Sequence, residues 1–377
     1  MKNRIIKFQE PYNSPLVKKY VLESLNSNYY STGSFESRAK QVLKEKFNIN
    51  NSLVTHSATG ALELIAIYLS KNFRKSIVHL PSYTFSSTAN AFLRSGFKLN
   101  FLDVELNDLM INLKNYSTFR KNDIVVPVHY SGHSVNFDNI NMLNNNFIIV
   151  EDAAQGLGSL WKNKQLGTIG KFGAISFHHT KNVQSGFGGL AISQFKEPME
   201  RLKYIYERGT DRNKVISGLK NKYEWVELGS SFQIPDILSA ILVAQLENYE
   251  KIISKRLEIT KFYNSLFSSI DSEFISLPNF SNYSHTNYHA YFIIFKTNKI
   301  AKEFLDFTYL NGISCYIGYV PLHNSKMGKK LNLNKKLTNT EFIHRKIVRL
   351  PIHTELSEKD LKYIEYVFRK FFTKLTA

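Results

Sequence analysis

The chain of 377 residues is poor in cysteine and has no long apolar run. Its single cysteine, Cys315, excludes a disulfide within the chain and fits a reducing compartment. No stretch approaches the roughly 18 apolar residues that a membrane-spanning helix needs. The first residues, MKNRIIKFQEPYNSP, carry charges but no apolar segment typical of a signal peptide. We therefore expect a cytoplasmic protein that makes no contact with a membrane.

Acidic residues are also scarce, because 31 Asp and Glu stand against 49 Lys and Arg, for a net charge of +18. Such a balance can indicate a nucleic-acid partner. However, the basic residues are scattered, and no basic run is interleaved with the stacking aromatics that single-strand binders use. We expect no nucleic-acid partner, and tight DNA binding at physiological salt would revive that alternative. The positive charge can still help to attract a polyanionic small molecule.

Several catalytic motifs are missing from the sequence. It has no P-loop, no G-x-G-x-x-G and no G-x-S-x-G. The pair His178-His179 lacks an accompanying set of acidic or cysteine ligands. Adjacent strand positions point to opposite faces, so these two rings are predicted to diverge. We expect no metal site.

Short apolar runs alternate with helical patterns through the first two-thirds of the chain. Helical periodicity is present at residues 58–70 and 86–95, and strand-like runs occur at 76–81, 99–104, 124–129, 147–150, 172–177 and 189–193. This alternation indicates βα units and a mostly parallel sheet. A long helical span, 234–267, is followed by strand-like runs at 290–296 and 314–320 and by helices at 300–309 and 358–375. We therefore expect an α/β protein with a large domain at residues 1–250 and a smaller α+β domain at 251–377.

An acid and a lysine each follow a predicted buried strand. Asp152 comes after the run 147–150, and Lys181 comes after the run 172–177 and before the glycine-rich stretch 185–189. In α/β sheets, ligands bind at the C-terminal ends of the strands. A carboxylate and an amine brought there together fit pyridoxal phosphate (PLP), because lysine forms a Schiff base with its aldehyde and aspartate pairs with its pyridinium nitrogen. The lysine must be neutral to attack, so its pKa must be lowered by desolvation. A solvated lysine and a turn-forming aspartate are the alternatives.

Other residues fit the remaining parts of that cofactor. The stretch Ser57-Ala58-Thr59-Gly60 opens a predicted helix, where free N–H groups and the helix dipole favour a phosphate, although an ordinary N-cap is the alternative. Ser176 offers a second hydroxyl. Gln155 follows Asp152 by three residues, and an aromatic of the segment PSYTF could stack on the ring unless it packs in the core.

Taken together, the segments resemble the DegT/StrS-type nucleotide-sugar aminotransferases, a branch of the fold type I PLP enzymes. The resemblance runs nearly from end to end and rests on SATGALE, PSYTFSSTANAF, FLDVELNDLMIN, VVPVHYSGH, VEDAAQGLGS, LGTIGKFGAISFHHTKN, ERGTDRN, KYEWVELGSSFQIPDILSA, AQLE, YVPLH and RLPI. Each segment by itself is modest evidence for the family, but the whole set in this order is a specific match to it. It implies a fold type I PLP-dependent transferase that resembles aspartate aminotransferase in architecture.

The resemblance also implies roles for particular residues. Lys181 would be the Schiff-base lysine and the later proton shuttle, and Asp152 would pair with the pyridine nitrogen. The phosphate would be held by Ala58, Thr59 and Ser176, and the ring would lie near Gln155 and Phe85. Ser231 would reach the neighbouring subunit's site, which implies a homodimer with shared active sites. Tyr319 and His323, in the YVPLH segment, would border the substrate.

Within the family, KYEWVELGSSFQ is similar to the subgroup that aminates dTDP-4-oxo-6-deoxy-D-glucose at C4, giving dTDP-4-amino-4,6-dideoxygalactose. That likeness implies L-glutamate as amino donor. Amination at C3 of a 3-oxo sugar, and a non-catalytic regulatory paralogue, remain alternatives. A sugar dehydratase would have histidine in place of Lys181. Two departures flank that lysine: His179 stands where the subgroup has an acid, and Gly186-Phe187-Gly188-Gly189 lacks the acid of the family's glycine turn.

Overall fold

The computed structural model describes residues 5–31, 33–112, 119–138, 147–270, 273–280, 283–333 and 335–376. A central seven-stranded sheet has the strand order β1-β9-β8-β5-β4-β2-β3. Its strands are β1 Ser52–Thr55, β2 Ile77–Pro81, β3 Lys98–Leu102, β4 Ile124–Val125, β5 Ile148–Asp152, β8 Phe172–Ser176 and β9 Gly189–Ser193.

Most of this sheet is parallel, as predicted. Strands β3, β2, β4, β5 and β8 run in one direction, while β9 is antiparallel to both of its neighbours. Strand β5 lies directly beside β8, and Asp152 is in register with Ala174. The C-terminal ends of these two strands therefore meet at one edge, which brings the acid and the lysine segment together.

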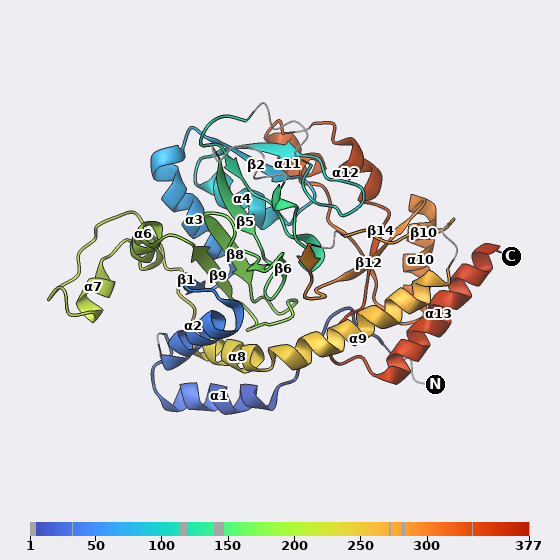
Figure 1. The fold of residues 1–377 in the computed structure, drawn as a ribbon, viewed down its shortest axis with the longest axis horizontal. Helices are drawn as coiled ribbons and strands as arrows, with labels where there is room; N and C mark the ends of the chain where they lie inside the picture. The colour runs from blue at the N-terminus through green and yellow to red at the C-terminus, as the bar shows by residue number, and fades with distance from the viewer. Residues whose placement is uncertain are drawn as a thin grey trace.

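Helices cover both faces of the sheet (Figure 1). One face packs against α3 (Ala58–Phe73), α4 (Ser86–Arg94) and α6 (Lys196–Tyr206), and it forms one continuous apolar cluster. A second group, α1 (Pro15–Asn26), α2 (Ser34–Phe47) and α8 (Asp236–Glu247), packs together around the other large cluster. Helix α3 buries Leu62, Leu64, Ile65, Ala66 and Leu69, so its apolar surface is too wide for an exposed helix.

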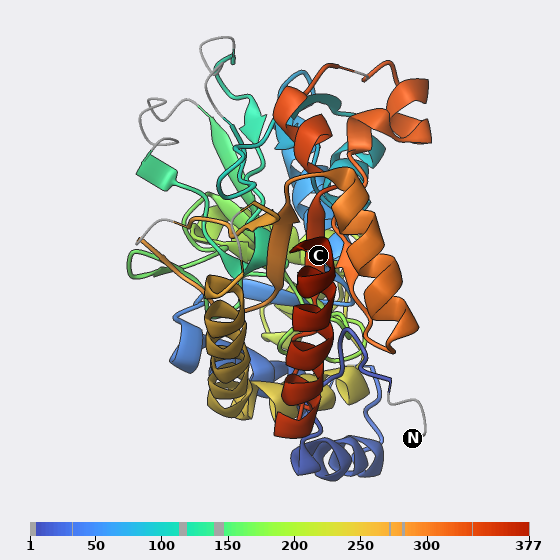
Figure 2. The same ribbon diagram turned by 90° about the vertical axis from the view of Figure 1, so that its right-hand side faces the viewer.

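A smaller sheet, ordered β10-β12-β14-β13, forms the C-terminal part, and all of its pairs are antiparallel. Its strands are β10 Ile275–Ser276, β12 Tyr291–Phe295, β13 Tyr316–Ile317 and β14 Ile347–Leu350. Helices α9 (Tyr249–Ser268), α10 (Asn298–Leu310) and α13 (Glu358–Thr376) surround it, with α9 and α13 side by side in both views (Figure 2). The C-terminal α+β arrangement is therefore present as predicted.

The two ends of the chain meet in this smaller unit. Ile6 forms a parallel bridge with Ile313 and belongs to the same apolar cluster as α9, α10 and α13. The helical span predicted at 234–267 is two helices, α8 and α9, which meet at Asn248. The domain boundary predicted at residue 250 lies close to this junction. Since the N-terminal segment packs against the C-terminal sheet and helices, a single cut at residue 250 does not separate the two units, and the boundary stays a prediction.

Shorter elements complete the described fold. A three-stranded sheet joins β6 (Leu160–Trp161), β7 (Lys164–Gln165) and β11 (Ser284–His285). Short helices α7 (Arg212–Ile216), α11 (Lys326–Lys330) and α12 (Thr338–Ile343) lie on connecting segments. Among the described residues, no helix has the length and apolar character needed to cross a membrane.

One segment stands away from the body of the molecule. The arm formed by residues 212–228 starts with α7 and projects at the left of Figure 1. It exposes large apolar side chains that include Ile216, Leu219, Tyr223, Trp225 and Leu228. Exposed apolar side chains gathered on one segment are typical of an interaction surface.

Candidate active site

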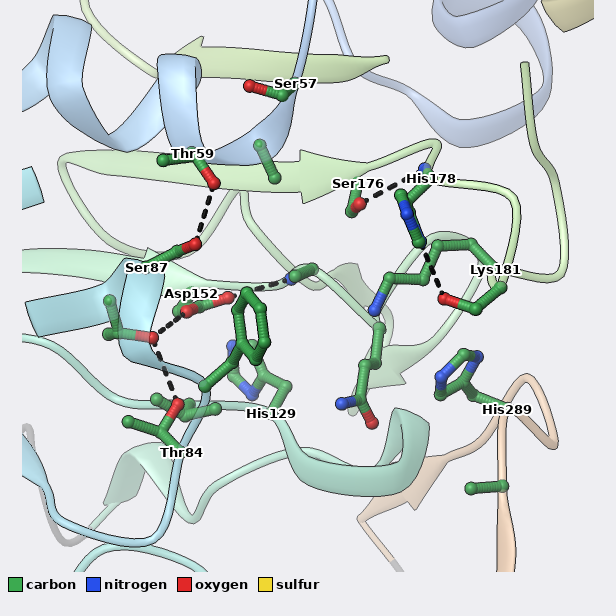
Figure 3. A pocket seen from close by; sticks show the side chains of 18 of the residues that line it. Ser57, Thr59, Thr84, Ser87, His129, Asp152, Ser176, His178, Lys181 and His289 are labelled. Carbon is green, nitrogen blue, oxygen red and sulfur yellow. Dashed lines mark hydrogen bonds between the residues drawn. The ribbon is translucent and has the colours of Figure 1, made fainter. Parts of the chain in front are cut away.

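The lysine segment begins where β8 ends, at Ser176. Lys181 N donates to His178 O, and the chain then returns to β9 through a turn at Gly186, whose φ of +78° favours glycine. The Lys181 side chain extends into a cavity of about 480 Å³ (Figure 3). Burial lowers its pKa from the usual 10.5 to about 8, Asp152 opposes that shift, and Arg349 adds to it. The sequence-based expectation of a lowered lysine pKa agrees with this structure.

The two acids at the end of β5 have different tasks because successive strand residues point to opposite faces. Asp152 lines the cavity, where Oδ2 accepts a hydrogen bond from Thr88 Oγ1 at 2.6 Å and Oδ1 accepts one from Ala154 N at 3.1 Å. Thr88 is in turn hydrogen-bonded to Thr84 at 3.0 Å. These contacts hold the Asp152 carboxylate in one orientation at the cavity wall (Figure 3).

Glu151 points away and is fully buried. Its oxygens accept from the backbone amides of Gly167, Ile169 and Gly170 at 2.6–2.7 Å. They are also 2.9 Å from His129 Nε2. Four donors thus satisfy the carboxylate, as a buried charge requires. Glu151 ties the loop before β8 to the end of β5 and so fixes the two strands that carry the site.

The start of α3 forms another wall of the cavity. Ser57 is the N-cap, and its Oγ accepts from Gly60 N, while Ala58 and Thr59 line the cavity with Ser176. The first amides of a helix have no partner within it, and the helix dipole there favours an anion. Thr59 Oγ1 lies 2.7 Å from Ser87 Oγ, at the start of α4. The starts of α3 and α4 and the end of β8 therefore meet at one place. We call this place the phosphate cradle, because its amides and hydroxyls suit a phosphate group.

Strand β9 approaches this cradle so closely that only glycine fits at its first residue. A Cβ on Gly189 would lie 2.3 Å from Ala58 N. Residues with a Cβ are excluded from this position unless the backbone moves. The glycine-rich sequence after Lys181 therefore serves to bring β9 against the start of α3.

Three further predicted residues, Phe85, Gln155 and Tyr319, line the same cavity. Phe85 is 59% exposed although it lines the cavity, so its ring is not covered by protein. Gln155 is fixed from two sides, because Oε1 accepts from Ser131 N at 2.7 Å and Nε2 donates to the Tyr319 hydroxyl at 3.0 Å. The Gln155 amide is therefore fixed inside the protein rather than facing solvent. Tyr319 also lines the cavity.

Two other predicted residues lie outside this cavity. Ser231 is exposed and forms a bridge with Glu207 beside the projecting arm. His323 is fully buried, 2.6 Å from Ser82 Oγ and 3.2 Å from Glu341. In the single chain, His323 therefore fastens one loop to the end of β2. Ser231 is exposed, so its side chain is accessible to another chain.

The prediction that His178 and His179 diverge was wrong. Strand β8 ends at Ser176, so the alternation of a strand no longer applies, and the ring centroids are 4.1 Å apart. Phe187 meets the His178 ring edge-on at 5.4 Å and is 62% exposed at the cavity. Across the described residues, no group of three or more His, Cys, Asp or Glu side chains is placed to hold a metal ion.

Apart from Tyr319, sequence reasoning missed the residues that the N-terminal segment and the C-terminal unit supply to the cavity. Phe8, His289 and Arg349 line it. Asn182 Nδ2 donates to Asn287 O, so the amide oxygen of Asn182 faces His289. His289 Nδ1 donates to this oxygen at 3.1 Å, and the Nε2 atom of His289 is therefore an acceptor. Burial holds the pKa of His289 well below its usual range. Arg349 lies in the RLPI segment, which belongs to the family resemblance and could have pointed to it. His289 lies in no segment of that resemblance.

The residues present fit PLP at each of its recognition points. The cradle at α3 suits the phosphate, the fixed Asp152 carboxylate suits a protonated ring nitrogen, and the uncovered Phe85 ring suits stacking. Lys181 has the lowered pKa that covalent attachment to an aldehyde requires. The fold and site therefore define a PLP-dependent enzyme built on an α/β large domain.

The comparison with protein families makes this more specific. The DegT/DnrJ/EryC1/StrS aminotransferase family model matches residues 13–369, so the chain belongs to that family of PLP-dependent aminotransferases. It is similar to the UDP-4-amino-4,6-dideoxy-N-acetyl-beta-L-altrosamine transaminase of Campylobacter jejuni subsp. jejuni serotype O:23/36, with 27% identity over 91% of each chain. It is also similar to the UDP-4-amino-4-deoxy-L-arabinose–oxoglutarate aminotransferase of Shewanella sediminis, with 25% identity over 91% of this chain and 92% of the relative.

Solved structures agree on the fold. The putative sugar aminotransferase Spr1654 of Streptococcus pneumoniae, solved in a PLP form, superposes with a TM-score of 0.88 at 21% identity, covering 98% of this chain and 99% of that one. At that identity the match supports the architecture alone. The predicted fold type I architecture is confirmed, and the curated relatives are nucleotide-sugar aminotransferases.

Proposed function

We propose that this enzyme transfers the amino group of L-glutamate to C4 of a nucleotide-linked 4-oxo-6-deoxy sugar. We further propose dTDP-4-oxo-6-deoxy-D-glucose as the sugar and dTDP-4-amino-4,6-dideoxygalactose as the product. The observation that carries the aminotransfer is the half-buried Lys181, with a pKa lowered to about 8, in one cavity with Asp152. The segment 222–233, KYEWVELGSSFQ, supports the choice of sugar by its resemblance to the C4-aminating subgroup.

The names of the relatives bear on the finer points. Both curated relatives carry a 4-amino sugar in their names, which supports C4, and one name includes oxoglutarate, which supports glutamate as donor. Both names also contain UDP rather than dTDP. The nucleotide is therefore the part of the proposal that a substrate comparison must test first.

Each part of the cavity has a task in this proposal. PLP, when bound, supplies an electron sink that allows an amino group to be exchanged for a ketone oxygen. Lys181 Nζ takes up and returns the proton at the substrate carbon, and general acid–base catalysis of this kind typically contributes ~10²–10⁴-fold. Asp152, held by Thr88, would pair with the ring nitrogen and favour its protonated form. The start of α3 would bind the phosphate, and Gln155 and Phe85, which line the same cavity, would lie near the ring.

We further propose that the enzyme is a homodimer, with Ser231 of each chain completing the phosphate site of the other. The exposed arm at 212–228 and the position of Ser231 outside its own cavity support this arrangement. Burial of the arm's apolar side chains against a second copy would remove them from water.

The test is a product assay with purified enzyme, PLP and L-glutamate. It compares dTDP-4-oxo-6-deoxy-D-glucose, its UDP counterpart and a 3-oxo sugar nucleotide, with each product identified by NMR. We expect a 4-amino-4,6-dideoxygalactose product from the dTDP sugar, and none with Lys181→Ala. Efficient amination of the UDP sugar alone would overturn the dTDP assignment, and a 3-amino product would overturn C4. Undiminished turnover by Lys181→Ala would overturn the role of the lysine.

A further inference from the structure

Phe187 is an exposed aromatic side chain inside the active-site cavity. It lines the cavity that holds Lys181, and it is 62% exposed. It occupies the glycine turn after the lysine, at the position where the family resemblance leads us to expect an acid. A single exposed apolar side chain on an open surface is ordinary, but one inside a ligand cavity is available to contact the ligand. The uncovered ring therefore indicates that an apolar part of a ligand packs against it.

The turn that carries Phe187 is closed by hydrogen bonds. His179 N donates to Gly186 O at 2.9 Å, across the connection from β8 to β9. Phe187 O accepts from Ser185 Oγ, also at 2.9 Å. A Cβ on Gly188 would clash with that hydroxyl, so a larger residue there would displace it. The backbone on both sides of Phe187 is therefore fixed, and the ring is held at the cavity before any ligand arrives.

Phe187 is connected to the reacting lysine through His178. The two rings meet edge-on, with 5.4 Å between their centroids. His178 in turn lies beside Lys181 (Figure 3), because the charges of His179 and Lys181 add to the effect of burial in lowering the pKa of His178. Phe187, His178 and Lys181 thus form one side of the cavity. A sugar whose keto carbon reaches the lysine brings the substituents of the neighbouring ring carbons towards this side.

We propose that Phe187 packs against the methyl group, carbon 6, of the 6-deoxy sugar and so selects 6-deoxyhexoses over pentoses. This inference rests on the proposed amination at C4, but it does not depend on which nucleotide the sugar carries. The ring carbons that flank C4 are C3, which bears a hydroxyl, and C5, which bears the methyl group. Of these two substituents only the methyl is apolar, so it is the one that gains from leaving water against an aromatic ring.

The nucleobase is the other part of the substrate that could stack on an aromatic ring. It is separated from C4 by the sugar ring and the diphosphate, and it therefore lies farther from the lysine than the methyl group does. The contact of Phe187 with His178, next to Lys181, favours the methyl group.

The experiment compares two acceptors on the same nucleotide, a 4-oxo-6-deoxyhexose and the 4-oxo pentose that lacks carbon 6. With the holoenzyme and L-glutamate, we expect wild type to favour the 6-deoxyhexose by about 10- to 100-fold in kcat/KM, as one carbon in an apolar pocket provides. Phe187→Ala should reduce this preference to less than about threefold. Phe187→Leu, which keeps a smaller apolar side chain, should give an intermediate value.

The matched control is Phe195→Ala. Phe195 is another exposed phenylalanine, at 55%, but it lies just beyond the far end of β9 and outside the cavity. This variant should keep the preference of wild type. Conversion of the PLP form by L-glutamate, followed by absorbance, checks the fold of Phe187→Ala and should change less than about threefold, because the proposed contact is with the sugar alone.

A second readout is calorimetric binding of two sugars that cannot react, the 6-deoxy-D-galactose and the L-arabinose derivatives of the same nucleotide. They differ by the same methyl group, and Phe187→Ala should abolish the difference in affinity that wild type shows. An unchanged preference in Phe187→Ala, or equal losses for both sugars, would overturn the proposal. So would conversion of a wild-type dimer into a monomer by Phe187→Ala, which would assign the ring to a contact between chains. Failure of wild type to aminate any 4-oxo sugar would instead refute the proposed function.

Discussion

At the residue scale, the site depends on side chains whose properties are set by their neighbours. Lys181 is an ordinary surface residue type that burial converts into a nucleophile, because desolvation disfavours its charged form. Two hydrogen bonds, one from Thr88 and one from the backbone, hold the Asp152 carboxylate in the orientation in which it can pair with a cation. Both features lead to measurable consequences.

The lowered pKa of Lys181 predicts a pH-dependent stability of the cofactor-free chain. Its pKa is about 8 when folded and 10.5 as the usual value, so between these limits the unfolded state binds more protons and stability rises with pH. Below pH 8 Lys181 is protonated in both states, so the folded chain carries the full free-energy cost of holding that charge away from water. Lys181→Met should therefore be more stable than wild type at pH 7, by at most about 3 kcal/mol, since solvent reaching the cavity screens the charge. The difference should vanish above a pH of about 10.5.

Urea unfolding of the two cofactor-free proteins at pH 7, 9 and 10.5 measures this difference. Taking wild type minus variant at each pH cancels the titration of all other groups. A difference that stays constant across the range would show that Lys181 is not the titrating group.

Thr88 is predicted to act through Asp152 rather than on the substrate. Thr88→Val keeps the shape but removes the 2.6 Å hydrogen bond, which is worth roughly 1.5–3 kcal/mol to a charged acceptor. We expect turnover to fall about tenfold or more, with the absorbance of bound PLP shifted because its ring nitrogen is held less firmly. Thr88→Ser, which keeps the hydroxyl, should restore both, and failure of that rescue would contradict a hydrogen-bonding role.

At the element scale, the site is an assembly of helix starts and strand ends. The strand-like runs at 147–150 and 172–177 were predicted close to their observed positions, because buried parallel strands are continuous apolar runs. The run at 124–129 is only a two-residue strand, since residues beyond Val125 leave the ladder to form the cavity wall. Helices α1 and α2 were not predicted. The buried Asp236 carboxylate, which accepts from Ser24 and Phe35, is a contact that fastens them to α8 and cannot be read from local periodicity.

The N-cap of α3 should contribute both to folding and to phosphate binding. Ser57→Ala removes the side-chain acceptor of Gly60 N and should lower the free energy of unfolding by about 1 kcal/mol. It should also weaken PLP binding, because the helix start that holds the phosphate loses order. Thr297→Ala removes the corresponding cap of α10, away from the cavity, and is the matched control. Chemical denaturation and PLP titration measure the two effects, and equal losses of PLP affinity in both variants would contradict the phosphate role.

At the scale of the whole molecule, the cavity lies between units that are distant in sequence. The central sheet and its helices supply Lys181, Asp152 and the phosphate cradle, while the N-terminal segment and the C-terminal unit supply Phe8, Tyr319 and Arg349. The projecting arm at 212–228 exposes the apolar side chains that support the proposed homodimer. Ser231, next to this arm, finds no place in the cavity of its own chain.

The arm gives a direct test of the homodimer. Trp225 is 78% exposed, so Trp225→Glu should leave the fold of the chain intact but place a charge in the expected interface. Sedimentation equilibrium should then show a monomer at concentrations where wild type is a dimer, and PLP affinity should fall. Tyr309→Glu, at an 80% exposed aromatic of the C-terminal unit, is the control and should remain dimeric. A monomeric wild type would refute the shared active site.

The sequence by itself determined the βα alternation, the acid and the lysine at two strand ends, and the glycine and serine positions around them. These are local properties, set by the periodicity of buried strands and by the backbone freedom of glycine. Only the tertiary structure decided that Glu151 ties β5 to the loop before β8, that His323 lies outside the cavity, and that Arg349, His289 and Phe8 lie within it. Those outcomes depend on strand order, on where β8 ends and on how the C-terminal sheet packs against the large domain. Such relations join residues hundreds of positions apart, and no short segment of sequence contains them.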